Sequence, residues 1–201
     1  VGFLEQICDL ADKYNAVTYC DEVHAIGLYG EHGAGVLEQR GMLDRVDIIS
    51  GALGKAVGTH GGYITAKHDV IDAIRCVSAG FIFTTSLSPV VCAGSIASIK
   101  YLKDTPGNEL RKTHQQKANT LKELLRQEKI EIFENDTHLV PVMIKDPVKC
   151  KKVSDLLLER HNIYVQPINY PSVPKGTERL RFAPTPFHTD AMIHDLVVKI
   201  K

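Results

Sequence analysis

One lysine of the chain stands in a stretch made almost entirely of small residues, residues 50–58 (SGALGKAVG). A mostly apolar run, residues 46–49, precedes Lys55, and two glycines, Gly61 and Gly62, follow it. Lysine is strongly hydrated and normally lies on a polar surface. Small neighbours let the backbone approach a ligand closely, and a partly dehydrated pocket favours the neutral, nucleophilic amine. Such an amine can form a Schiff base, whereas the commoner case is a surface lysine in a flexible glycine loop.

A second group of polar residues, Asp21, Glu22 and His24, directly follows the apolar residues 16–20. Open α/β sheets gather their ligand sites at the carboxyl ends of strands. A carboxylate there can pair with a protonated heterocyclic nitrogen, and a nearby histidine can hydrogen-bond a hydroxyl or phenolate. Metal binding competes, but spacing of the HExxH type is absent from the sequence. Taken alone, an aspartate that caps a turn and a packed histidine are the simpler interpretation.

Three further residues, Thr84, Thr85 and Arg181, could bind anions. The threonines precede Pro89, where a helix is expected to begin, and their hydroxyls could hold a phosphate there. Arg181 lies in an expected strand and could hold a carboxylate in bidentate fashion. Singly, each is better explained by helix capping or, for Arg181, by a structural salt bridge with Glu178 or another acid. An acid, a lysine, a hydroxyl cluster and a distal arginine together are the set that a pyridoxal phosphate enzyme needs.

Apolar periodicity and the positions of glycine and proline predict the elements that must carry these residues. Before residue 105 we expect helices at residues 3–14, 36–40, 68–78 and 89–102, and strands at residues 16–20, 46–50, 62–66 and 81–83. Asp21 and Lys55 then each follow the end of a buried strand. Alternation of helices, strands and ligand loops is typical of an α/β layered domain.

The segment TPGN at residues 105–108 is the clearest break in the chain. After it we expect a helix at 109–127, a strand at 139–144, a helix at 148–161, an extended segment at 163–165, a proline-rich loop at 167–174, a strand at 179–182 and a helix from Thr189. This order is typical of a small α+β domain behind a bridging helix. We therefore expect two domains, at residues 1–107 and 108–201.

Composition excludes several classes of protein. Among 201 residues, Lys+Arg and Asp+Glu both number 24, so no basic excess attracts nucleic acid or an anionic membrane. No apolar run approaches the roughly 20 residues that span a bilayer, and no signal or transit peptide is visible. Five scattered cysteines without CxxC spacing indicate reduced thiols in place of a disulfide framework or zinc site.

Four segments resemble the 5-aminolevulinate synthase family, in the same order and over nearly the whole chain. They are residues 21–30 (DEVHAIGLYG), 51–56 (GALGKA), 80–87 (GFIFTTSL) and 164–174 (YVQPINYPSVP). The first two are typical of the wider α-oxoamine synthases, which are fold-type I pyridoxal phosphate enzymes. The resemblance implies the carboxyl-terminal part of a large α/β domain, with a mostly parallel sheet flanked by helices, and a small α+β domain.

The resemblance also implies a role for each matching residue in binding pyridoxal 5'-phosphate. Lys55 would form the Schiff base and remove the α-proton of glycine. Asp21 would pair with the pyridine nitrogen and His24 with the phenolate oxygen. Thr84 and Thr85 would bind the cofactor phosphate from the partner subunit of a homodimer whose active site lies at the interface.

The substrate contacts implied by the resemblance lie near the carboxyl end. Arg181 would hold the glycine carboxylate, and Ser172, where the family usually has threonine, would contact the succinyl carboxylate of succinyl-CoA. Ala52 stands where the family usually has a phosphate-binding threonine, so we expect weaker cofactor binding. Ser88 in place of proline and Lys175 in place of arginine are milder departures.

The implied activity is that of a pyridoxal phosphate-dependent acyltransferase of haem and tetrapyrrole biosynthesis, which condenses glycine with succinyl-CoA and decarboxylates the product to 5-aminolevulinate. Two alternatives are open: an α-oxoamine synthase similar to 2-amino-3-ketobutyrate CoA ligase, and an inactive truncated chain. The chain begins with Val1, inside a helical pattern, and lacks the family's first half. We therefore expect a piece of a longer protein that is inactive alone. The family works in the mitochondrial matrix or the bacterial cytoplasm, and residues 110–116 favour the matrix.

Overall fold

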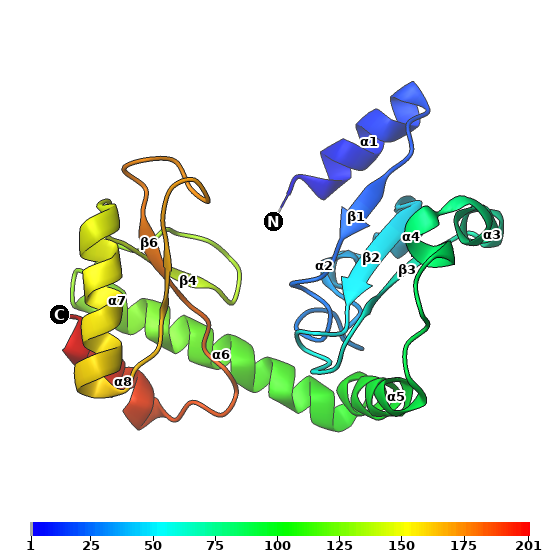
Figure 1. The fold of residues 1–201 in the computed structure, drawn as a ribbon. Coiled ribbons are helices and arrows are strands. Elements are labelled where there is room, and N and C mark those ends of the chain that lie inside the picture. The colour runs from blue at the N-terminus through cyan, green and yellow to red at the C-terminus, as the bar shows by residue number, and fades with distance from the viewer. Residues whose placement is uncertain (1) are drawn as a thin grey trace. The chain divides into compact units, whose positions relative to one another are not determined.

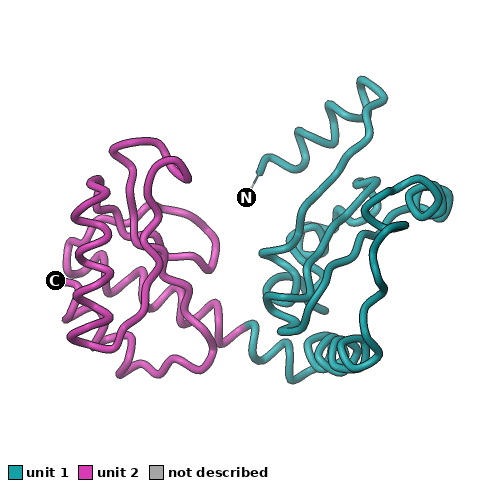
Figure 2. The backbone as a smooth tube through the Cα atoms, in the orientation of Figure 1, with its two compact units in different colours: residues 1–111 teal, residues 112–201 magenta. Residues whose placement is uncertain are grey.

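The computed structural model of the chain describes residues 2–201, and its backbone forms two compact units. The first unit ends at Arg111 and the second begins at Lys112 (Figure 2). This division lies within a helix, α6 (Thr105–Gln127). The backbone leaves helical geometry at Asp104, immediately before the expected break at residues 105–108, and those residues form the first turn of α6. Pro106 fits in this turn because a missing N–H costs no intrahelical bond there.

The first unit contains a three-stranded sheet in the order β1-β2-β3 (Figure 1). Its strands are β1 (Tyr19–Asp21), β2 (Ile48–Ala52) and β3 (Gly62–Ala66). β1 and β2 are parallel, whereas β2 and β3 are antiparallel. β1 begins later than expected, because the Thr18 N–H donates to the Asp47 carboxylate at 2.9 Å and not to a backbone carbonyl. The α/β fold class is confirmed, with a mixed sheet in this part of the chain.

The helices of this unit follow the predicted periodicity with one exception. They are α1 (Leu4–Tyr14), α2 (Val36–Gln39), the 3-10 turn Leu43–Arg45, α3 (His68–Val77), α4 (Ala79–Ile82) and α5 (Pro89–Lys103). The strand expected at residues 81–83 is wrong. The N–H groups of Phe81 and Ile82 both donate to the Ser78 carbonyl, at 3.0 and 2.9 Å, which closes a helical turn. Local hydrogen bonds therefore override the β propensity of this aromatic run.

The second unit packs α6, α7 (Pro147–His161) and α8 (Asp190–Ile200) with an antiparallel sheet in the order β4-β6-β5. The strands are β4 (Val140–Met143), β5 (Gln166–Ile168) and β6 (Arg179–Phe182). β5 begins just after the expected extended segment. Thr189 caps α8 as predicted, since its hydroxyl accepts the Met192 N–H at 3.2 Å. The core of this unit consists chiefly of Leu121, Leu125, Val140, Val142, Cys150, Leu157, Leu180 and Phe182.

Two chain-wide features bear on the expected class of protein. The five cysteines are free thiols. Across residues 2–201, no helix combines the length and the apolar character that a membrane crossing requires.

Candidate active site

The loop that carries Lys55 joins β2 to β3 and is closed by its own backbone. We call residues 53–61 the lysine loop. The Leu53 N–H donates to the Gly61 carbonyl at 2.9 Å, and the Thr59 N–H donates to the Leu53 carbonyl at 2.8 Å. Lys55 therefore stands in a loop whose two ends are held together at the edge of the sheet.

Lys55 is exposed, and the partly dehydrated pocket expected from the sequence is not present around it. The side chains of Leu53 and Val57 are buried and anchor the lysine loop to the first unit. The Gly58 N–H donates to the Lys55 carbonyl at 3.0 Å, so the backbone of the lysine is defined by a turn. Because the buried anchors lie on either side of it, the lysine faces outward and stays in solvent in this chain.

Asp21 lies at the same edge of the sheet as the lysine loop. β1 and β2 are parallel, with Asp21 opposite Ser50, so the carboxyl ends of both strands meet there. Asp21 and His24 are both exposed. One carboxylate oxygen, Asp21 Oδ1, accepts the Val23 N–H at 2.7 Å, which is the turn-capping bond of the simpler interpretation. Because the cap uses Oδ1, the Asp21 carboxylate still offers its other oxygen at the edge of the sheet where the lysine loop begins.

Two segments pack closely on the lysine loop. A Cβ atom built on Gly27 would lie 2.6 Å from the Ala56 Cβ, so the backbone after β1 lies directly against the neighbour of Lys55. On α5, the Ser95 hydroxyl lies 2.7 Å from the Thr59 hydroxyl. The backbone around Lys55 is therefore held from two directions, although its amine is not covered.

Thr84 and Thr85 lie in the irregular segment between α4 and α5, and both are exposed. A Cβ built on Gly61 would lie 2.9 Å from a Leu87 methyl carbon, so this segment passes against the lysine loop. The cap of α5 is Ser88, whose hydroxyl accepts the Val91 N–H at 3.4 Å. The threonines thus precede the helix N-terminus, and the structure places them in an exposed loop next to the lysine loop.

Glu22 has a structural task that the sequence did not indicate. Only 3% of it is exposed, and its carboxylate accepts the N–H groups of Val36 at 3.1 Å and Leu37 at 2.7 Å. A carboxylate in this position caps α2. Sequence reasoning grouped Glu22 with Asp21 as a candidate ligand. The sequence around Asp21 and Glu22 does not distinguish their roles, because the partners of Glu22 are Val36 and Leu37, which lie 14 and 15 residues further along the chain.

Arg181 lies in β6, opposite Pro141 of β4 and Gln166 of β5. It is exposed, whereas Glu178, Leu180 and Phe182 are buried. Side chains of a strand alternate between its faces, so Arg181 points away from Glu178. Glu178 Oε2 has no hydrogen-bond partner among residues 2–201. The structural salt bridge considered for Arg181 is therefore not formed with this glutamate.

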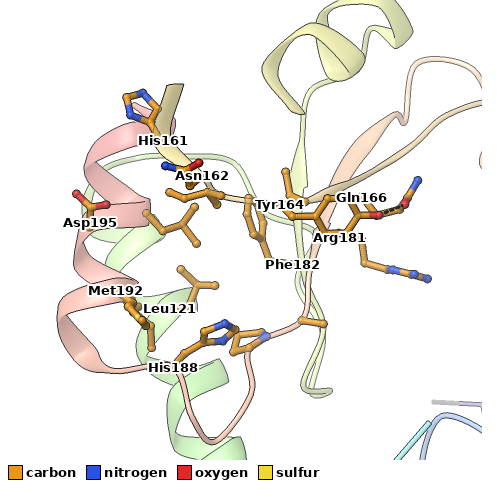
Figure 3. Close-up of a pocket in the computed structure, with 16 residues that line it drawn as sticks. Leu121, His161, Asn162, Tyr164, Gln166, Arg181, Phe182, His188, Met192 and Asp195 are labelled. Carbon is orange, nitrogen blue, oxygen red and sulfur yellow. Dashed lines mark hydrogen bonds between the residues drawn. The ribbon is translucent and has the colours of Figure 1, made fainter. Parts of the chain in front are cut away.

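A cavity of about 720 Å³ opens beside Arg181, wholly within the second unit (Figure 3). Its wall is mostly apolar, with Leu121, Phe182 and Met192 among the lining residues. Figure 3 shows Arg181 at one margin, with its guanidinium directed away from the hollow. Arg181 contributes to the wall of the cavity, whereas its guanidinium is available to a ligand on the outer side of the sheet.

Ser172 lies in the loop between β5 and β6 and is exposed. Its N–H donates to the Asn169 carbonyl at 2.9 Å, which forms a turn that presents the hydroxyl outward. Lys175 follows in the same loop, with its ammonium 5.1 Å from the centre of the Tyr170 ring. Ser172 and Arg181 are the two predicted substrate residues that belong to the second unit.

The predicted site residues thus form two groups. The first unit brings Asp21, His24 and Lys55 to one edge of its sheet, and the segment of Thr84 passes against the lysine loop. The amine of Lys55 can bind a carbonyl compound covalently, and the carboxylate of Asp21 can pair with a basic nitrogen of a heterocycle. Over the part of the chain that the structure describes, no three His, Cys, Asp or Glu side chains gather as ligands for a metal ion.

A sequence model described as aminotransferase class I and II matches residues 2–200.

Curated relatives with high identity carry the name 5-aminolevulinate synthase. The chain is 54% identical to 5-aminolevulinate synthase 1 of Cereibacter sphaeroides over 196 residues, which cover 98% of the chain and 48% of that protein. It is 51% identical to the enzyme of Bradyrhizobium diazoefficiens, over 98% of the chain and 47% of that protein. The Paracoccus denitrificans enzyme is 53% identical over 98% of the chain and 48% of that protein. The chain therefore spans about half the length of the curated relatives it matches.

Solved structures of serine palmitoyltransferases have the same fold. A variant from S. paucimobilis with a bound PLP–myriocin aldimine superposes with a TM-score of 0.91 at 29% identity, covering 100% of this chain and 50% of that chain. The Sphingomonas wittichii enzyme has a TM-score of 0.91 at 28% identity, covering 98% and 49%. At 22% identity and a TM-score of 0.80, 8-amino-7-oxononanoate synthase of Francisella tularensis shows the fold alone, over 97% of this chain and 57% of that one.

Proposed function

Because the chain belongs to the class I and II aminotransferase family, we propose that it is part of an enzyme that condenses glycine with succinyl-CoA and releases carbon dioxide to form 5-aminolevulinate. The observation that carries this proposal is that about half of all residues are identical to relatives named for that reaction. The product feeds haem and tetrapyrrole synthesis. Residues 1–107 would then belong to the large cofactor-binding domain and residues 108–201 to the small domain.

We propose pyridoxal 5'-phosphate as the cofactor, because the residues at the sheet edge fit it. When bound, this group draws electrons from an attached amino acid and makes its α-proton acidic. Lys55 Nζ would hold the cofactor covalently and would remove the α-proton of glycine. The Asp21 carboxylate would keep a proton on the pyridine nitrogen, and His24 would donate to the ring oxygen. The parallel pairing that brings Asp21 and the lysine loop to one edge supports these roles.

The remaining roles depend on groups outside one unit. We propose that Thr84 and Thr85 bind the cofactor phosphate of the partner subunit in a homodimer, and their exposure supports a role across an interface. Arg181 receives the glycine carboxylate with its planar fork of donors. Ser172 donates to the succinyl carboxylate, which an acetyl-CoA substrate lacks.

Restoring a hydroxyl at position 52 is expected to tighten cofactor binding. Ala52 is the last residue of β2, immediately before the lysine loop. A hydrogen bond to a charged group contributes about 1.5–3 kcal/mol, so Ala52→Thr is expected to lower the dissociation constant of pyridoxal phosphate by about 10- to 100-fold. The measurement is a titration followed by cofactor absorbance. Ala52→Val, which adds the same bulk without the hydroxyl, is the matched control, and equal tightening by valine would contradict the explanation.

The proposed activity is tested in a full-length setting. The 196 matched residues of the Cereibacter sphaeroides relative are replaced by this chain, and the chimera is assayed with glycine and either succinyl-CoA or acetyl-CoA. The proposal predicts 5-aminolevulinate from succinyl-CoA and little turnover of acetyl-CoA. Preference for acetyl-CoA would favour the rival related to 2-amino-3-ketobutyrate CoA ligase.

A non-catalytic partial chain is the second candidate, favoured by the exposed Lys55 and the half-length match. A chimera that folds and binds the cofactor but turns over neither acyl-CoA would support it. The relatives reported above are bacterial, so they give no support to the mitochondrial matrix expected from the sequence. We propose the bacterial cytoplasm as the compartment.

A further inference from the structure

Arg111 is a buried cation at the start of α6. Only 5% of it is exposed. Its Nη1 donates to the Leu102 carbonyl at 2.5 Å, and its Nη2 donates to the Glu31 carbonyl. Burial lowers the pKa of the guanidinium, against the opposing charge of Glu38. A buried cation raises the free energy of the fold unless it is hydrogen-bonded. The two carbonyls that accept from Arg111 therefore fix the position of its guanidinium.

The guanidinium lies directly against the glycine-rich segment of residues 27–35, which we call the glycine loop. A Cβ built on Gly33 would lie 2.9 Å from Arg111 Nη1 and 3.3 Å from the Gly27 Cα. The Gly27 N–H donates to the Gly33 carbonyl at 2.7 Å. Gly33 has a φ of +77°, a conformation that other residues rarely adopt. Gly33 is therefore held between the guanidinium and Gly27.

The glycine loop is held on another side by Glu38 of α2. The Glu38 carboxylate accepts the Ala34 N–H at 2.8 Å and the His32 N–H at 3.2 Å. A segment with so many glycines has little conformational preference of its own, so these external contacts determine its shape. Arg111 holds the loop at Glu31 through a hydrogen bond and at Gly33 through packing, and Gly33 in turn lies against Gly27.

Gly27 is the residue of the glycine loop that packs against the lysine loop. It has a φ of +79°, and a Cβ at this position would lie 2.6 Å from the Ala56 Cβ. Ala56 is bonded to Lys55. A continuous set of close contacts thus runs from Arg111 through Gly33 and Gly27 to the residue beside the lysine.

We propose that Arg111 is a positioning residue for Lys55, which fixes the glycine loop against Ala56 and so sets the conformation of the lysine loop. Its relevance to catalysis rests on the proposed function of Lys55, whereas its effect on the loop does not. Loss of the guanidinium frees the Glu31 carbonyl and removes the surface on which Gly33 packs. The lysine loop then opens more often without unfolding of the second unit.

The first test is amide hydrogen exchange of the 201-residue chain, followed by mass spectrometry. In Arg111→Met, peptides covering the lysine loop are expected to exchange at least about tenfold faster, because bonds to a charged donor are lost. Peptides from α7 report on global unfolding and are expected to be unchanged. Arg75→Met, at an exposed arginine of α3, is the matched control and is expected to leave the lysine loop unchanged. Faster exchange in the glycine loop alone would overturn the proposal.

Arg111→Lys keeps the charge but not the planar fork, and it guards against a variant that does not fold. It is expected to give a smaller increase in the same peptides. Ala56→Gly removes the methyl group that Gly27 contacts and leaves Arg111 in place. If Arg111 acts through this contact, Arg111→Met adds little exchange in the Ala56→Gly background. Full additivity of the two changes would contradict the contact path.

The second test has a chemical readout. The full-length chimera is incubated with pyridoxal phosphate, reduced with borohydride and digested, and the label on Lys55 is divided by the label on exposed Lys67. Arg111→Met is expected to lower this ratio about tenfold, because the same loop opening misplaces the amine. An unchanged ratio would overturn the positioning role. Absence of preference for Lys55 in the unsubstituted chimera would instead count against the proposed function, and hydrogen exchange would still decide the contact path.

Discussion

Lys55→Ala is expected to abolish 5-aminolevulinate formation by the full-length chimera, with kcat lowered by at least about a thousandfold. The lysine supplies both the covalent bond to the cofactor and the base that removes the glycine α-proton. No other residue of the lysine loop replaces it, because none has the primary amine that forms the covalent bond to the cofactor. Turnover and the visible absorbance of the bound cofactor are measured together.

The matched control for this experiment is Lys67→Ala. Lys67 is an exposed lysine of the same unit, immediately before α3. Its replacement is expected to leave turnover within about twofold of the unsubstituted chimera, as for most surface substitutions. Normal turnover in Lys55→Ala would remove the lysine from the mechanism.

Arg181→Leu is expected to raise the KM for glycine by about a hundredfold, because a bidentate, charge-assisted pair with the carboxylate is lost. The position supports this role, since the guanidinium is exposed on β6 and directed away from the neighbouring cavity (Figure 3). Steady-state kinetics with varied glycine at saturating succinyl-CoA give the measurement. The KM for succinyl-CoA is expected to change little.

Two variants define the specificity of that result. Arg181→Lys keeps the charge but loses the fork, and an intermediate KM is expected. Arg160→Leu changes an exposed arginine near the end of α7 in the same unit and is expected to leave the KM for glycine unchanged. A higher KM for succinyl-CoA with an unchanged KM for glycine would reassign Arg181 to the other substrate.

The helices and strands with clear apolar periodicity were predictable from the sequence. α1, α3, α7 and α8 follow the expected ranges closely, and Thr189 caps α8 through its hydroxyl. These elements depend on patterns within a single segment, which sequence reasoning can see. The strand predicted at the aromatic run of residues 81–83 is wrong, because hydrogen bonds to the Ser78 carbonyl outweigh the β propensity of these residues.

The site was predictable in part. Residue type and strand position identified Asp21 and Lys55, and parallel pairing of β1 with β2 brings them to one edge. The exposure of Lys55 was not predictable, because it depends on what packs around the loop. The capping role of Glu22 and the packing of Arg111 on Gly33 were missed for a related reason. Both join residues that are far apart in the sequence, and no local pattern reports such contacts.

The central claim is that Lys55 carries the cofactor of an enzyme of the 5-aminolevulinate synthase type. The most direct measurement is peptide mapping of the chimera after borohydride reduction in the presence of pyridoxal phosphate. The account predicts one dominant label, on the peptide that contains Lys55, and a decrease in that label when saturating glycine alone is added before reduction, because the amine of glycine displaces the lysine from the cofactor. A dominant label on another lysine, with 5-aminolevulinate still formed, would contradict it.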